Sequence, residues 1–280
     1  MKSRLISAAI VAALTLTGVS MYAQEKAEHK FPQPDQSGKI GIAAHRGFWK
    51  CEAAGNSQNS IAALKAAQDN KFWGSEFDVQ LTKDGVAIVN HDDRIQGMKI
   101  IEHDFADFKK CKLANGESIP TLDDYLKQGA KSKKTILVLE IKSQDSKEHE
   151  DQLLDLIYAS LKSHKLMKPE RVMFISFSHY VCQRLAKDCP EFTIQYLNGD
   201  LTPETLAAEG INGIDYQYRK VAQHPEYITE CKALGMSSNA WTVDKEANIK
   251  NMIELGVGTI TTNEPLLVRS LLKSKELRKK

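Results

Sequence analysis

The sequence lacks an excess of charge of either sign. Its 38 lysines and arginines nearly balance its 36 aspartates and glutamates, which gives a formal net charge of +2. Nucleic-acid-binding proteins typically carry a basic face that pairs with phosphates, and no basic stretch interleaved with aromatic residues occurs here. Nucleic acid is therefore not an expected partner.

Cysteine is scarce and unpatterned. The chain has five cysteines and no Cys-x-x-Cys pair, so a thiolate zinc site is not expected. Cys182 and Cys189 would lie about two turns apart on one helix, too far for a disulfide. Cys51 and Cys111 fall in loops near the candidate site described below, and they are the pair that we would expect to be bonded.

A long apolar run occurs only at the N-terminus. Lys2 and Arg4 precede an apolar run over residues 5–19, and small residues follow as far as Ala23. This pattern is typical of a secretory signal peptide and is too short for a membrane span. We predict cleavage after Ala23, no stable membrane anchor, and a periplasmic or secreted mature protein. Residues 24–38 are polar with two prolines and are predicted to form a flexible leader.

From residue 39 to 280, strand patterns alternate with helical patterns about eight times. The expected strands are 40–44, 76–81, 135–139, 172–177, 192–197, 213–217, 238–243 and 259–262. Eight such units predict an α/β fold, a (β/α)8 TIM barrel. An open doubly wound sheet is the competing architecture, but no glycine-rich phosphate loop follows any strand. Residues 94–120 break the periodicity and are predicted to form a small insertion after the strand ending at His91.

The stretch from residue 74 to residue 91 contains the central residues of a candidate functional site. Glu76 and Asp78 point to one face of a predicted strand, while Phe77 and Val79 point to the other. Two carboxylates on the inner face of a barrel are costly unless they are paired or bind a metal. A turn and a second apolar run then bring His91 back toward them.

Further polar residues follow other strands at the same predicted edge, where active sites of such barrels lie. Glu140 joins Glu76 and Asp78 as a third carboxylate, and three carboxylates without cysteine suit Ca²⁺ or Mg²⁺. We predict these three residues as the metal ligands. Trp241 ends the seventh strand and is predicted to line the substrate pocket.

Two cations and two histidines complete this predicted site. Arg46 and Lys142 beside a divalent cation suit a substrate phosphate. His45 and His91 supply a general acid and a general base. Together, these residue types predict metal-assisted cleavage of a phosphodiester, with a small molecule as the substrate.

A set of ordered motifs resembles the glycerophosphodiester phosphodiesterase family over residues 40–271. The motifs are His45-Arg46-Gly47, Glu76-x-Asp78, Leu81 to Gly85, His91-Asp92, Leu139 to Lys142, Trp241-Thr242-Val243 and Gly256 to Pro265. The resemblance implies a TIM barrel and hydrolysis of glycerophosphodiesters to sn-glycerol 3-phosphate and an alcohol. By position it implies the same metal ligands, acid–base pair and phosphate contacts as above. It also implies attack by the glycerol 2-hydroxyl to give a cyclic phosphate that water opens.

The sequence departs from this family where Gln58 stands in place of the usual glutamate before the first helix. Two other functions remain open: a phospholipase of C or D type on the same barrel, and a non-catalytic protein that binds a phosphate ligand. Retention of both histidines with all three carboxylates favours the enzyme. The leaving alcohol, the choice between Ca²⁺ and Mg²⁺ and the oligomeric state are not indicated.

Overall fold

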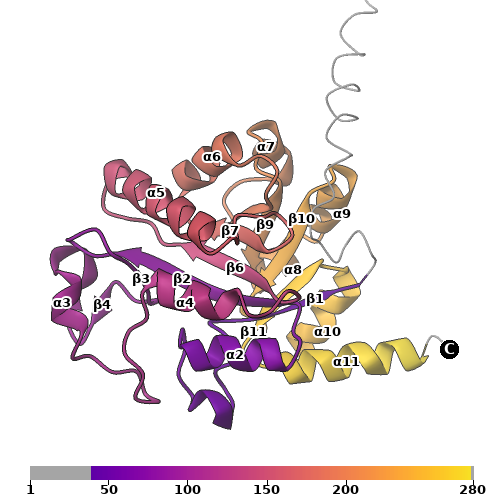
Figure 1. The fold of residues 1–280 in the computed structure, drawn as a ribbon. Coiled ribbons are helices and arrows are strands. Elements are labelled where there is room, and N and C mark those ends of the chain that lie inside the picture. Colours follow the sequence, from indigo (N-terminus) through magenta and orange to yellow (C-terminus); the bar gives the residue numbers. More distant parts are fainter. Residues whose placement is uncertain (1–38, 279–280) are drawn as a thin grey trace, which may run out of the picture. The chain divides into compact units, whose positions relative to one another are not determined.

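Eight parallel strands form a closed barrel in the computed structural model, which describes residues 39–278 (Figure 1). Around the barrel they are β1 (Gly41–Ala44), β2 (Gly74–Leu81), β6 (Ile136–Ile141), β7 (Val172–Ser176), β8 (Ile194–Tyr196), β9 (Gly213–Gln217), β10 (Ser237–Trp241) and β11 (Thr259–Thr262). Strand β1 pairs with both β11 and β2, which closes the sheet. The predicted fold is confirmed, whereas the predicted signal peptide (1–23) and leader (24–38) lie outside the described residues.

Helices cover the outside of the barrel (Figure 1). They are α2 (Ile61–Asp69), α4 (Leu122–Gly129), α5 (Lys147–Ser163), α6 (His179–Asp188), α7 (Pro203–Ala208), α8 (Tyr218–Gln223), α9 (Glu226–Ala233), α10 (Glu246–Leu255) and α11 (Pro265–Arg278). Hydroxyl side chains at Ser60, Thr121, Ser146, Ser178 and Thr202 cap five of them. None of the helices between residues 39 and 278 has the length and apolar character that a bilayer span needs.

After β9 the structure has two helices in close succession, α8 and α9, which meet at His224 and Pro225. Proline disfavours helical geometry in the residue before it and cannot donate a backbone hydrogen bond. The chain therefore breaks at His224 and restarts at Pro225.

The barrel interior combines an apolar cluster with buried polar residues. The apolar cluster consists of six buried residues: Ala43, Ile136, Val138, Met173, Ile175 and Leu197. Strands β8 to β11 instead contribute buried polar residues: Gln195, Asp215, Ser237, Asn239 and Thr261. Side chains of a strand alternate between the surrounding helices and the barrel interior. Inward-pointing residues near the carboxyl end of a strand therefore lie at the rim of the barrel.

The segment after β3 (Ala87–Val89) corresponds to the predicted insertion and packs with β3 around a small core of its own. Strand β3 runs antiparallel to β2 and is followed by β4 (Arg94–Ile95), β5 (Met98–Lys99), η4 (Ile100–Glu102) and α3 (Phe105–Phe108). Its buried apolar residues are Ile88, Ile95, Ile100, Phe108, Cys111 and Ile119. Glu117 ties it to the barrel, since its carboxylate accepts from the backbone N–H groups of Ile61 and Ala62 at 2.9 and 3.1 Å. These contacts also cap the start of α2.

The expected disulfide between Cys51 and Cys111 is wrong. No disulfide links any of the cysteines between residues 39 and 278. Cys111 is buried in the core of the insertion. Cys51 directly precedes the short 3-10 segment η3 (Glu52–Ala54), and its thiol donates to the Phe48 carbonyl at 3.0 Å. Each thiol is therefore held by its own local packing.

Candidate active site

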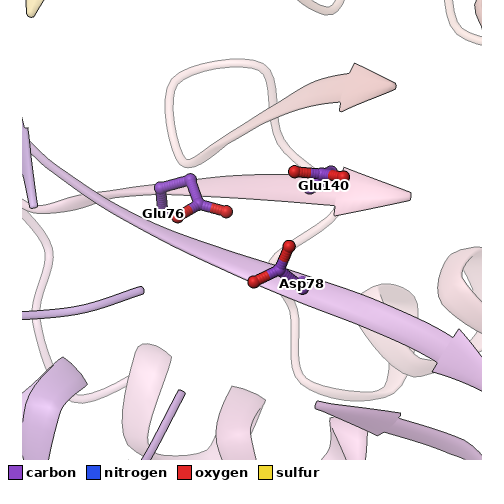
Figure 2. A group of neighbouring side chains, drawn as sticks. All are labelled: Glu76, Asp78 and Glu140. Carbon is purple, nitrogen blue, oxygen red and sulfur yellow. The ribbon is translucent and has the colours of Figure 1, made fainter. Parts of the chain in front are cut away.

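Three buried carboxylates meet at the carboxyl ends of β2 and β6. Glu76 and Asp78 lie two residues apart on β2, and Asp78 is in register with Glu140 on the neighbouring strand β6. One oxygen from each carboxylate lies within 4.8 Å of the others, and Figure 2 shows the three groups facing one another. The sequence predicted this cluster, and the strand pairing explains it.

Mutual repulsion and burial change the acidity of these groups. Burial, reinforced by the charges of Asp78 and Glu140, raises the pKa of Glu76 well above its ordinary value. Burial and the Asp78 charge likewise raise the pKa of Glu140 to about 7. For Asp78, burial acts upward, but Lys142, His91, Asn59 and Arg46 outweigh it, and the net pKa is lowered.

The cluster fits a hard divalent cation. Its donors are all carboxylate oxygens, which Ca²⁺ and Mg²⁺ prefer. Oε1 of Glu76 is buried without a hydrogen-bond partner among the described residues. The raised pKa values of Glu76 and Glu140 come from burial and from mutual repulsion, which a bound cation would relieve. These features match an ion that would bind between the three groups.

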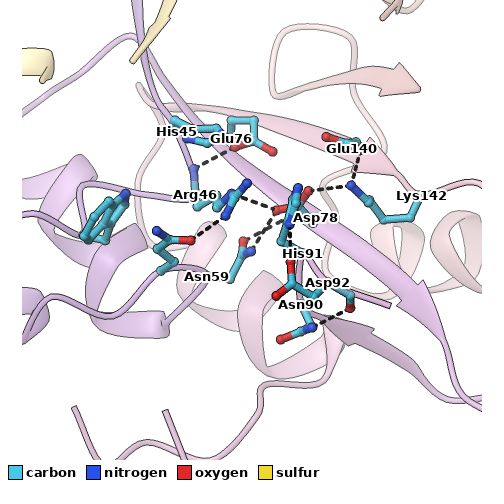
Figure 3. Close-up of polar contacts among 12 residues, drawn as sticks. His45, Arg46, Asn59, Glu76, Asp78, Asn90, His91, Asp92, Glu140 and Lys142 are labelled. Atoms are coloured by element: carbon cyan, nitrogen blue, oxygen red, sulfur yellow. Dashed lines mark hydrogen bonds and ion pairs between the residues drawn. The ribbon is translucent and has the colours of Figure 1, made fainter. Parts of the chain in front are cut away.

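Two cationic side chains flank the cluster (Figure 3). The Lys142 ammonium lies 2.8 Å from Glu140 Oε1 and 3.5 Å from Asp78 Oδ1. Arg46 Nε lies 3.8 Å from Asp78 Oδ2, and its Nη1 donates to Gln58 Oε1 at 2.6 Å. Gln58 therefore orients the guanidinium without adding a charge.

The loop after β1 holds Arg46 in an uncommon backbone conformation. Its φ is 54°, and its backbone N–H donates to Glu76 Oε2 at 2.7 Å. Gly47 follows with φ 78°, where a Cβ would lie 2.6 Å from that of Ala63 on α2. Glycine at this position is needed for the close approach of loop and helix.

Asn263 determines which ring nitrogen of the neutral His45 carries the proton. Its Oδ1 accepts from Trp49 Nε1 at 2.8 Å, and its Nδ2 donates to Asp244 Oδ2 at 2.8 Å. An indole N–H only donates and a carboxylate only accepts, so the orientation of the amide is determined. His45 Nδ1 lies 3.0 Å from the same Oδ1 and must be the donor. Neutral His45 therefore keeps a lone pair on Nε2.

Burial also keeps His45 neutral. Burial and then the Arg46 charge lower its pKa from 6.5 to about 4. Because the folded value lies below the unfolded one, this group contributes stability above pH 6.5 that is lost as the pH falls toward 4. We expect a ¹⁵N NMR titration to show a neutral His45 ring at pH 5, and a midpoint near 6.5 would contradict this environment.

Gln80 holds the second histidine in place. Its Nε2 donates to the backbone carbonyls of Asn90, His91 and Asp92, which follow β3. His91 Nδ1 also lies 2.7 Å from Asp92 Oδ1. The return strand is thus anchored to the face of β2 that carries Glu76 and Asp78.

These residues surround a cavity of about 140 Å³. Its polar lining includes His45, Arg46, Glu76, His91 and Glu140, and its apolar wall includes Phe177 and Trp241. The Phe177 and Trp241 rings contact edge to face with centroids 5.5 Å apart, and Trp241 Nε1 donates to the Asp215 carbonyl at 2.8 Å. Asp78 and Lys142 join this group through their ion pairs. The structure thus brings all eight predicted site residues together.

Several residues at the site were not predicted from the sequence. Asn59 donates to Asp78 Oδ2 at 2.8 Å, and Asp244 and Gln80 act as described above. Asp215 also lines the cavity, and burial and then the Glu140 charge raise its pKa well above the ordinary range. The sequence contained one signal for Gln80 and Asp215. Each is a polar residue at an inward-pointing position of a predicted strand, where an apolar residue would be usual.

The fold and the geometry of the site together define the class of protein. Carboxylates, cations and imidazoles converge at the carboxyl-end rim of a (β/α)8 barrel, where such barrels carry out catalysis. The arrangement can hold a divalent cation beside an anionic group and has two imidazoles that can move protons. This is the architecture of a barrel enzyme that acts on an anionic substrate.

Comparison with known proteins identifies the family. The model of the glycerophosphoryl diester phosphodiesterase family matches residues 45–267, and the chain belongs to that enzyme family. A glycerophosphodiester phosphodiesterase structure from Parabacteroides distasonis is 40% identical with a TM-score of 0.82, over 85% of this chain and 98% of that one. The glycerophosphodiester phosphodiesterase of Caldanaerobacter subterraneus subsp. tengcongensis is 29% identical over 84% of this chain and 98% of its own length.

A third relative shows the same fold at lower identity. The Oleispira antarctica phosphodiesterase, 21% identical, has a TM-score of 0.70 over 83% of this chain and 96% of that one. Its structure contains the product sn-glycerol-3-phosphate.

Proposed function

We propose that this protein is a divalent-cation-dependent hydrolase that cleaves glycerophosphodiesters to sn-glycerol 3-phosphate and an alcohol. The observation that carries the proposal is the grouping of three carboxylates, two cationic side chains and two histidines around one cavity. Five of these seven side chains line the cavity, and Asp78 and Lys142 adjoin it through ion pairs. The family assignment and the product in the Oleispira structure support it.

The protein residues divide the chemistry between them. Glu76, Asp78 and Glu140 would hold Ca²⁺ or Mg²⁺, which when bound supplies positive charge to the phosphate oxygens. Arg46 and Lys142 contribute further positive charge on the phosphate. The cavity wall at Trp241 and Phe177 is apolar and suits the carbon face of the glycerol unit.

The two histidines act as base and acid. His45 Nε2 carries a lone pair and takes the proton from the attacking hydroxyl, the glycerol 2-hydroxyl in the first step. His91 donates a proton to the oxygen of the departing alcohol. In the second step the roles reverse, and water opens the cyclic phosphate.

Product analysis tests the proposal against its alternatives. The protein with Mg²⁺ or Ca²⁺ is incubated with glycerophosphodiesters and with intact phospholipids, and ³¹P NMR and a glycerol-3-phosphate dehydrogenase assay follow the products. Glycerol 3-phosphate and free alcohol are expected. Phosphorylated alcohol, or turnover of intact lipid alone, would favour a phospholipase, and tight binding without turnover would favour a non-catalytic binder.

We also propose that the protein is exported to the periplasm or secreted. The proposal rests on the basic, apolar and small-residue segments of residues 2–23. N-terminal sequencing of protein from a cell fractionation is expected to give Gln24 as the first residue outside the cytoplasm. Full-length protein in the cytoplasmic fraction would contradict it.

Asn263 is proposed as a positioning residue for His45. Replacing Asn263 with leucine removes the acceptor that holds the Nδ1–H, and we expect kcat to fall about 10²-fold because the ring loses its orientation. ¹⁵N NMR should show His45 in mixed tautomers, a change that a merely structural role would not produce. Retention of the single Nδ1–H tautomer would contradict the assignment.

A further inference from the structure

A second cavity of about 200 Å³ adjoins the first one. The two share Arg46 and His91. The other residues that line it come from three loops: Asn56, Ser57, Gln58 and Asn59 before α2, Asn90 and Asp92 after β3, and Leu113 and Ala114 of the insertion. We call this space the amide pocket.

We propose that the amide pocket binds the leaving alcohol and selects an uncharged polyol, such as glycerol or inositol, over choline. This inference rests on the proposed function and deepens it. A phosphodiester has two arms, and the phosphate must lie beside the carboxylate cluster. With the glycerol arm against Phe177 and Trp241, the second arm extends past Arg46 and His91 into the amide pocket.

The position of His91 supports this direction. It lines both cavities, so a phosphodiester that spans them places its leaving oxygen beside the imidazole that protonates it. The imidazole of His45, in contrast, lines the first cavity and not the amide pocket. Base and acid therefore face the glycerol arm and the alcohol arm respectively.

The lining chemistry favours hydroxyl groups. Amides both donate and accept hydrogen bonds, as alcohols do. Among the described residues, the Asn56 amide and the Gln58 Nε2 make no hydrogen bond, so both are available to a ligand. A quaternary ammonium group is typically bound by aromatic rings, and no aromatic residue lines this pocket. Arg46 and Asp92 on the lining carry opposite charges, so the pocket has no net negative charge that would attract a cation.

The pocket is built into the fold. Ser57 Oγ accepts from the Asn115 backbone N–H at 2.7 Å, and Asn115 Nδ2 donates to the Ala54 carbonyl at 3.2 Å. These contacts join the insertion to the loop that carries Asn56 and Gln58. The two walls are thus held at a fixed separation, which gives selectivity by size as well as by hydrogen bonding.

Steady-state kinetics with four substrates test the proposal: glycerophosphoglycerol, glycerophosphoinositol, glycerophosphoethanolamine and glycerophosphocholine. We expect kcat/KM for the two polyol substrates to exceed that for the choline substrate by about tenfold or more, as two or more headgroup hydrogen bonds would give. A choline preference, or equal values for all four, would overturn it.

Two variants test whether the headgroup binds in the amide pocket. Ala114→Phe fills the pocket and is expected to raise KM for the inositol substrate at least about tenfold, with the Ki of glycerol 3-phosphate unchanged. Ala106→Phe is the matched control, because Ala106 is another exposed alanine of the insertion that lines neither cavity. An equal effect of both variants, or a raised Ki for glycerol 3-phosphate, would contradict the assignment.

A second variant removes the amide without filling space. Asn56 has φ 54°, a conformation that glycine adopts readily. Asn56→Gly is expected to raise KM for polyol substrates about threefold to tenfold and to raise KM for the choline substrate by less. If the wild-type protein turns over none of the four substrates, the proposed function itself is contradicted. If the wild-type protein is active but the variants show none of these headgroup effects, only the assignment of the amide pocket is contradicted.

Discussion

Replacing His45 with glutamine is expected to lower kcat by about 10²–10⁴-fold. The imidazole is neutral, its Nδ1–H is held by Asn263, and its Nε2 is the free base at the cavity. Glutamine keeps a polar side chain but cannot take a proton at neutral pH. Initial rates of glycerol 3-phosphate release measure the effect, and circular dichroism checks the fold.

His224→Gln is the matched control for this variant. His224 is partly exposed and pairs with Glu226 near the start of α9, away from the cavity lining. It should retain wild-type kcat. His45→Gln should still bind glycerol 3-phosphate, since its cationic contacts remain. If His45→Gln keeps more than about a tenth of the wild-type kcat, the assignment of His45 as the base is wrong.

Replacing Glu76 with glutamine is expected to abolish cation-dependent activity and cation-dependent stabilisation together. A ligand at about 100 times its Kd stabilises a folded protein by about 2.7 kcal/mol, and Glu76→Gln removes one of the three expected ligands. Thermal unfolding with and without Mg²⁺ or Ca²⁺ measures this. A variant that the cation stabilises as strongly as wild type would contradict the assigned ligand set.

The same variant has a defined pH signature in cation-free protein. Glu76 and Glu140 have raised folded pKa values, so their contribution to stability is complete below about pH 4.5 and is lost as the pH rises toward 7. Glutamine cannot ionise, and its neutral amide also reduces the repulsion on Glu140. Cation-free Glu76→Gln should therefore lose less stability between pH 5 and 8 than wild type.

The fold and the central residues of the site could be predicted because they depend on local patterns. Strand β2 alternates apolar and acidic residues, and that alternation alone places Glu76 and Asp78 on the inner face. Parallel pairing then brings Glu140 beside them. Both steps need only the period of the strand and its position in the barrel.

The supporting residues could not be predicted because their partners are set by three-dimensional geometry. In the sequence, Gln80 is one of several polar residues in an alternating strand. Its role depends on the path of the chain after β3, which brings the backbone carbonyls of residues 90–92 to its side-chain amide. Asp244 contacts Asn263 across two neighbouring loops. Asp215 is buried because all eight strands close around it, a property that no single window of sequence contains.

The central claim is that a cation held by the three carboxylates enables glycerophosphodiester hydrolysis. The most direct measurement is glycerol 3-phosphate release from glycerophosphoglycerol by protein treated with EDTA and then given Mg²⁺ or Ca²⁺, with Glu76→Gln in parallel. The account predicts release that disappears with EDTA, returns with the cation and stays absent in Glu76→Gln. Release that persists in EDTA at the full rate, or that the cation restores equally in Glu76→Gln, would contradict it.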